Sequence, residues 1–167
     1  MVKRLILRAA FYLFIFSLPL GLGAFCPYLT LSGGVFDFLR ERHRTGEIRL
    51  EYEAAASFCY FHPLLGALQT FKGASYLYGG LALDLPCSPL VVIPSISAGY
   101  YHEGGGKNLG FPLEFRSTLT LGFEVRTGAR IGLQIAHISN AHLGHRNPGE
   151  ETLSLVFSFP LKGIAQR

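Results

Sequence analysis

Alternation of apolar and polar side chains is the dominant pattern of the chain from residue 29 onward. In residues 48–58, for example, Leu50 and Tyr52 fall on one face of an extended chain, and Arg49 and Glu51 fall on the other. This period of two indicates β-strands rather than helices. We predict about eight strands, the smallest usual number for a transmembrane barrel. They span Leu29–Leu39, Ile48–Tyr60, Leu64–Ser75, Leu77–Leu85, Leu90–Tyr101, Leu113–Val125, Ala129–Asn140 and Thr152–Leu161.

The connections between these strands alternate in length. The long connections are residues 40–46, 102–112 and 141–150, and the short ones include His62-Pro63, residues 86–89 and residues 126–128. Long outer loops that alternate with short periplasmic turns are typical of outer-membrane barrels. Many of the strands also exceed the soluble norm of about five or six residues. Pro94, inside the fifth strand, predicts a bulge or a local break.

The polar face of the strands carries charges of both signs. Its members are Arg49, Glu51, Glu53, Glu114, Arg116, Glu124, Arg130 and Gln134. A soluble, lipocalin-like barrel would turn the apolar face inward and these residues outward. Opposite charges can instead pair inside a narrow barrel, where unpaired charges would be costly. We therefore predict an all-β fold, an eight-stranded antiparallel transmembrane β-barrel of the outer membrane, with its apolar face toward lipid.

The first residues have the features of a secretory signal peptide. Lys3 and Arg4 give a positive start, residues 9–20 are apolar, and residues 21–24 are small enough for cleavage. A transmembrane anchor is the alternative, but the apolar run is short and contains Pro19. We predict a signal peptide at 1–24 and a single barrel domain at 25–167. No later apolar stretch is long enough for a spanning helix, which again favours a closed barrel.

Composition narrows the range of partners. The net charge is +4 over 167 residues, without a basic stripe or a nucleic-acid motif, so we expect no nucleic-acid partner. Cys59 and Cys87 both fall at predicted periplasmic turns. An exported protein can hold disulfides, so these two cysteines form either a bridge or a pair of small buried thiols.

The candidate chemistry lies in the last third of the chain. His137 and Ser139 share the apolar face of one strand, and Glu151 begins the same face of the next strand. Hairpin pairing would bring Glu151 beside His137. A serine becomes a nucleophile when a base takes its proton and a third group orients that base. We predict Ser139 as nucleophile, His137 as base and Glu151 as the orienting acid. Asn140 and the backbone amides after it are candidate oxyanion donors.

Glu150 is the alternative to Glu151 as the acid. Its parity in the strand points to the barrel interior, so we predict that Glu151 takes this role. The connecting loop places the three residues at the outer rim, where polar groups facing lipid cost little. A substrate that is itself a lipid would reach them there.

Several segments resemble a known family. They are His137-Ile138-Ser139-Asn140-Ala141, Asn147-Pro148-Gly149, Glu151, Gly99-Tyr100-Tyr101, Leu109-Gly110, Glu114-Phe115-Arg116-Ser117 and Gly34-Val35-Phe36-Asp37-Phe38. The chain resembles the PagL-type lipid A 3-O-deacylases, most specifically in its last third. The resemblance implies an eight-stranded outer-membrane barrel of a Gram-negative bacterium that hydrolyses the ester-linked 3-position acyl chain of lipid A. The family's serine, histidine and acid fall on Ser139, His137 and Glu151.

The resemblance also implies roles for two asparagines. The family's asparagine after the serine falls on Asn140, where an oxyanion role is plausible, and Asn147 would support the loop. The expected partners are lipid A (lipopolysaccharide) as substrate, the outer-membrane bilayer and, as an option, a second copy of the chain. We expect neither a cofactor nor a metal. The alternatives are a non-catalytic adhesion or structural barrel and a soluble lipocalin-like binder.

Overall fold

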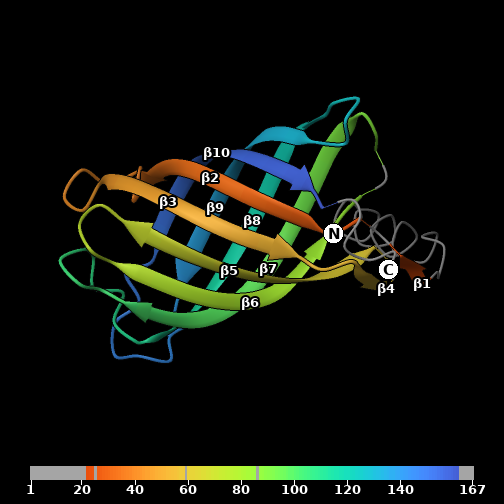
Figure 1. The fold of residues 1–167 in the computed structure, drawn as a ribbon. Helices are drawn as coiled ribbons and strands as arrows, with labels where there is room; N and C mark the ends of the chain where they lie inside the picture. Colours follow the sequence, from red (N-terminus) through yellow and green to blue (C-terminus); the bar gives the residue numbers. More distant parts are fainter. Residues whose placement is uncertain (1–21, 25, 59, 86, 162–167) are drawn as a thin grey trace, which may run out of the picture.

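The computed structural model describes residues 22–24, 26–58, 60–85 and 87–161, and its main body is an antiparallel β-barrel (Figure 1). The barrel strands are β2 (Tyr28–Phe36), β3 (Thr45–Glu53), β5 (Phe61–Thr70), β6 (Ser75–Leu83), β7 (Leu90–His102), β8 (Leu113–Glu124), β9 (Arg130–Ser139) and β10 (Glu150–Pro160). Neighbouring strands pair in sequence order, and β10 pairs with β2 to close the barrel. The predicted eight-stranded fold is therefore confirmed.

Two short strands lie outside this cylinder. They are β1 (Leu22–Ala24) and β4 (Ala56–Phe58), which pair with each other at the end of the barrel that carries the short turns (Figure 1). Most of the predicted signal peptide, residues 1–21, lies outside the described residues, as does Cys59, so the cleavage and the disulfide stay predictions. In the described part of the chain, no helix is long and apolar enough to cross a membrane.

Two strand boundaries differ from the prediction. His62-Pro63, expected as the turn between the second and third strands, lies within β5. The turn between the third and fourth strands, expected next to Ser75, comprises residues 71–74. There Gly73 adopts a φ of 91°, a left-handed conformation that glycine tolerates best. The amide of Ala74 donates to the Thr70 hydroxyl at 2.9 Å and closes the turn.

The predicted bulge at Pro94 is also wrong, because β7 is continuous and Pro94 pairs with Leu119. The ladder between β6 and β7 ends at the Ala82–Ser95 pair, so the neighbouring Pro94 has no paired residue on β6. A proline at the end of a ladder removes no interior hydrogen bond, so the strand tolerates it.

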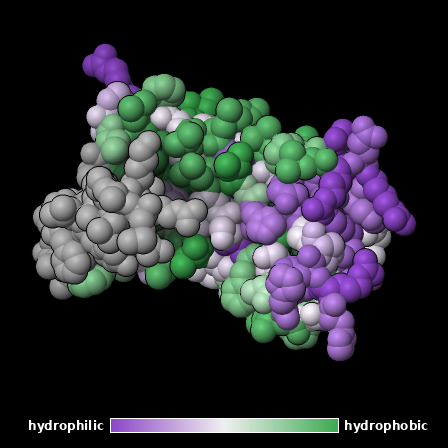
Figure 2. Space-filling view, turned by 180° about the vertical axis from the view of Figure 1, so that it is seen from behind, coloured by the Kyte–Doolittle hydropathy of each residue, from purple (hydrophilic) through white to green (hydrophobic). Residues whose placement is uncertain are grey.

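The apolar face of the barrel points outward. On β3, Leu50 is 51% exposed whereas Arg49 is 1% exposed, and the same alternation runs through the other strands. Figure 2 shows hydrophobic residues over the barrel wall and hydrophilic residues gathered at the end that carries the long loops. This arrangement confirms the prediction that the apolar face meets lipid.

The interior is held together by paired polar side chains. Arg49 and Arg116 both donate to the side-chain amide oxygen of Gln134. Nearer the end with the short turns, the Arg130 guanidinium bridges Asp84 at 2.7 Å and Glu124 at 3.0 Å. Arg130 is therefore neutralised by two carboxylates and Arg116 lies 4.0 Å from the Glu51 carboxylate, whereas the Arg49 guanidinium is held by the neutral side chains of Gln134 and Ser32.

The outer loops form one connected layer at the opposite end. Residues 37–44, 71–74, 103–112 and 140–149 make up this end of the barrel (Figure 1). Buried Lys107, from the loop between β7 and β8, forms an ion pair with buried Asp37, from the loop between β2 and β3. The loops are thereby fixed relative to the strand ends that carry the candidate site.

Candidate active site

Strands β8, β9 and β10 place the candidate residues on the outer wall of the barrel. In the register of β9 with β10, His137 lies directly opposite Glu151, and on the other side His137 lies opposite Ser117 of β8. The His137 side chain is 51% exposed and the Glu151 side chain is 24% exposed. Glu150 is fully buried inside the barrel, as its parity predicts.

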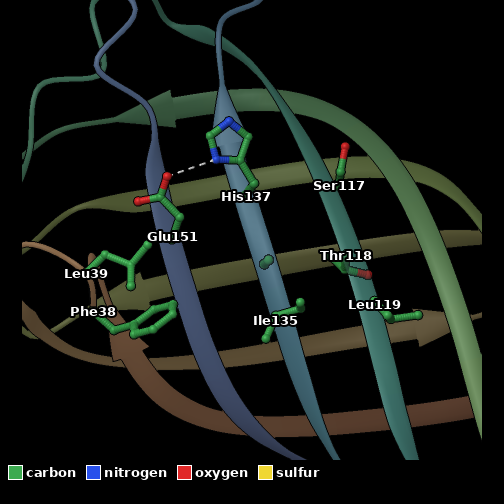
Figure 3. A pocket seen from close by; sticks show the side chains of 9 residues that line it. Phe38, Leu39, Ser117, Thr118, Leu119, Ile135, His137 and Glu151 are labelled. Carbon is green, nitrogen blue, oxygen red and sulfur yellow. Dashed lines mark ion pairs between the residues drawn. The ribbon is translucent and has the colours of Figure 1, made fainter.

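His137 and Glu151 are in contact. Nδ1 of His137 lies 3.4 Å from Oε1 of Glu151, and Figure 3 shows this pair above the apolar side chains of the wall. Because the carboxylate occupies the Nδ1 side, Nε2 is left as the nitrogen that can receive a proton from a nucleophile. The carboxylate can also stabilise the ring when it becomes positively charged.

Ser139 lies on the same face of β9, two residues closer to the loop, and is partly exposed. Across the strand pair its neighbour is Phe115 of β8. Among the described residues no hydrogen bond joins the Ser139 hydroxyl to His137, whose recorded polar contact is the one with Glu151. Residues two apart on a strand are about 7 Å apart along the chain.

Asn140 has the opposite parity and is fully buried. Its side-chain nitrogen donates to the carbonyls of Leu109 at 2.9 Å and Arg146 at 2.7 Å, and its side-chain oxygen accepts the amide of His142 at 2.9 Å. The side chain is therefore engaged in holding two loops together. The amides of His142 and Leu143 donate within the turn, to the side-chain oxygen and the backbone carbonyl of Asn140. Of the oxyanion donors that the sequence suggested in this turn, the amide of Ala141 is therefore the remaining candidate.

The backbone after Asn140 has an uncommon conformation. Ala141 and His142 have φ values of 50° and 63°. Two consecutive non-glycine residues in the left-handed region are unusual and are typical of functional sites. Asn147 supports this turn, because its side-chain oxygen accepts the amide of Asn140 at 3.1 Å.

An open pocket of about 360 Å³ adjoins His137 and Glu151 (Figure 3). It is lined by Phe38, Leu39, Ser117, Thr118, Leu119, Ile135, Ala136, His137 and Glu151. Most of these side chains are apolar, so the pocket offers a hydrocarbon surface beside the His–Glu pair.

Sequence reasoning missed several of these pocket residues. Phe38 and Leu39 were expected in the first strand, but β2 ends at Phe36 because Asp37 turns the chain with a φ of 54°. Ser117 gave a signal that could have been used, since it is the polar member of an otherwise apolar register on β8.

Comparison with known proteins shows which family the chain belongs to. The profile of the family described as "Lipid A 3-O-deacylase (PagL)" matches residues 36–160. The chain belongs to the lipid A 3-O-deacylase (PagL) family. Lipid A deacylase PagL of Pseudomonas aeruginosa (strain PAO1) is 35% identical over 57 residues, which is 34% of this chain and 33% of that protein. The aligned segment therefore spans about a third of the curated relative.

Solved structures share the fold. The structure titled "Crystal structure of the outer membrane enzyme PagL" matches with a TM-score of 0.63 at 17% identity and covers 80% of this chain and 99% of its own. A designed transmembrane β-barrel matches with a TM-score of 0.59 at 10% identity and covers 84% of this chain and 98% of its own. With the apolar outer wall and the family membership, the PagL-like barrel belongs in the outer membrane of a Gram-negative bacterium.

Proposed function

We propose that this protein is a lipid A 3-O-deacylase that hydrolyses the ester-linked 3-position acyl chain of lipid A by a Ser-His-Glu mechanism. The observation that carries the proposal is the contact between His137 and Glu151 on the lipid-facing wall, with Ser139 on the same face. A purely structural barrel has no need of an ionisable pair on its lipid-facing wall, and near the rim such a pair costs little stability. At the rim, the same pair meets the ester-bearing region of an outer-leaflet lipid.

In the proposed reaction, the Ser139 hydroxyl attacks the ester carbonyl while His137 Nε2 takes its proton. Glu151 holds the Nδ1 side and stabilises the imidazolium. The tetrahedral intermediate collapses as the ester C–O bond breaks, and His137 gives the proton to the sugar oxygen, which leaves as a hydroxyl. Water, deprotonated by His137, then attacks the acyl-enzyme, and His137 returns this proton to the Ser139 oxygen as the fatty acid is released.

The surroundings favour a long-chain substrate. The apolar pocket of about 360 Å³ beside His137 can receive part of the acyl chain. Its Leu119 and Ile135 side chains lie farther from the outer loops than His137 does, toward the middle of the barrel wall. We assign the oxyanion to the backbone amide of Ala141, since the amides of His142 and Leu143 already donate to Asn140, and the Asn140 and Asn147 side chains support this turn. Assembly into a homodimer stays a prediction.

The direct test is mass spectrometry of lipid A from Gram-negative cells that make the wild type, Ser139→Ala or His137→Ala. We expect the wild type alone to remove one 3-hydroxyacyl chain. The matched control for insertion is heat-modifiable migration of each barrel in electrophoresis. An unchanged lipid A profile with all barrels correctly inserted would refute the deacylase proposal and favour the non-catalytic barrel.

A further inference from the structure

The turn before Glu151 packs against the candidate base. Gly149 is buried and has a φ of 59°. A Cβ atom at this position would lie 3.0 Å from Cε1 of His137 and 3.6 Å from Nε2. The backbone of Gly149 therefore lies against the ring edge between the two nitrogens. It limits how far the imidazole can swing away from Glu151.

A residue from a distant part of the chain holds this turn in place. Nη1 of Arg40 donates to the carbonyl of Pro148 at 2.7 Å and to the carbonyl of Gly149 at 3.3 Å. Arg40 belongs to the loop between β2 and β3, which reaches the site because β2 pairs with β10 to close the barrel. Hydrogen bonds from a charged donor are about twice as strong as neutral ones.

The loop that carries Arg40 is itself anchored next to the catalytic carboxylate. The amide of Phe38 donates to the carbonyl of Glu151 at 2.9 Å. The amide of Asp37 donates to the Glu150 carboxylate at 3.3 Å, and the Asp37 carboxylate pairs with Lys107. The backbone just before Arg40 is thus held in place, and this restricts the positions from which the Arg40 side chain can reach the turn.

We propose that Arg40 is a positioning residue for the proposed esterase. By holding the carbonyls of Pro148 and Gly149, it keeps Gly149 against the imidazole of His137. The ring then keeps Nδ1 toward Glu151, the orientation that leaves Nε2 for proton transfer. This inference rests on the proposed function for its catalytic consequence, but the positioning itself can be observed without turnover.

A purely electrostatic role is the competing explanation. An outer-loop arginine could attract anionic lipid headgroups, and Arg42 in the same loop carries the same charge and is exposed. A headgroup role would raise KM in Arg40→Ala and Arg42→Ala alike. A positioning role would lower kcat in Arg40→Ala and leave KM unchanged, because substrate binding would be intact.

The first arm of the test measures kcat and KM on purified lipid A in detergent micelles for the wild type, Arg40→Ala, Arg40→Lys and Arg42→Ala. We expect Arg40→Ala to lower kcat by about 10- to 100-fold, the scale of a misplaced catalytic group. Arg40→Lys should recover part of this loss, since an ammonium group can hold one carbonyl, and Arg42→Ala should behave as the wild type. Unchanged kcat in Arg40→Ala, or an equal rise of KM in both alanine variants, would overturn the inference.

The second arm is independent of activity. Histidine labelled with ¹³C at Cε1 is introduced, and the His137 signal is assigned by its absence in His137→Gln. We expect this signal to shift or broaden in Arg40→Ala and to keep its position in Arg42→Ala, because Cε1 is the ring atom that lies nearest to where a Cβ at Gly149 would stand. If the wild type shows no activity but the His137 signal shifts in Arg40→Ala, the proposed function is refuted and the positioning role of Arg40 stands. An unmoved signal would defeat the positioning role whatever the activity.

Discussion

Replacement of Glu151 by glutamine removes one negative charge from the site and keeps the shape of the side chain. In the wild type, Oε1 of Glu151 lies 3.4 Å from Nδ1 of His137. The amide of glutamine can still hydrogen-bond to the ring, but it can no longer stabilise the positive charge that forms when His137 accepts the serine proton. The expected effect is therefore on kcat.

The size of the effect follows from the distance and the exposure. At 3.4 Å, two unit charges attract by about 5 kcal/mol at an effective dielectric constant of about 20, and by about 1.2 kcal/mol in water. These limits correspond to losses of about 4,000-fold and about 8-fold in rate. Because half of the His137 side chain is exposed, we expect a loss between them, of about 100-fold in kcat.

The assay is steady-state release of fatty acid from lipid A in micelles, with Glu150→Gln as the matched control. Glu150 is the adjacent residue and the substitution is chemically identical, but its side chain is buried on the interior face. We expect a smaller loss in Glu150→Gln than in Glu151→Gln. A greater loss in Glu150→Gln, or a fall of less than about 5-fold in Glu151→Gln, would refute the assignment, because the charge at 3.4 Å would then contribute less than it does in bulk water.

Three further outcomes are expected. Ser139→Ala and His137→Ala should each lower kcat/KM by at least about 1,000-fold, with heat-modifiable migration preserved; residual activity near the wild type would exclude that residue as a catalyst. Ile135→Trp should raise KM by about 10-fold by filling the pocket, whereas Leu133→Trp, on the same face but outside the pocket, should not; equal KM values would argue against the pocket as the acyl site. Arg130→Met should lower the free energy of unfolding by about 3 kcal/mol, since it leaves two carboxylates without their cation; urea titration followed by circular dichroism in micelles measures this, and an unchanged midpoint would contradict it.

Much of the barrel was predictable because the direction of each side chain depends on its position within its own strand. In a strand that faces lipid on one side, the period of two places Leu50 outward and Arg49 inward, independently of how the other strands pair. Turn positions were harder to predict where the signal was ambiguous. Pro63 and Pro94 are accepted inside strands because the neighbouring ladders end beside them, and that circumstance is visible only after the strands have been paired.

The sequence by itself determined that His137, Ser139 and Glu151 lie on the lipid-facing side and that Glu150 does not, because strand parity and a hairpin connection are short-range properties. Only the tertiary structure decided what surrounds them. Closure of the barrel by β10 and β2 brings Arg40 to Pro148, a contact between residues 108 positions apart. It also forms the pocket wall with Phe38 and Leu39. No periodic pattern encodes such contacts, since they depend on which strand edges meet when the sheet curves on itself.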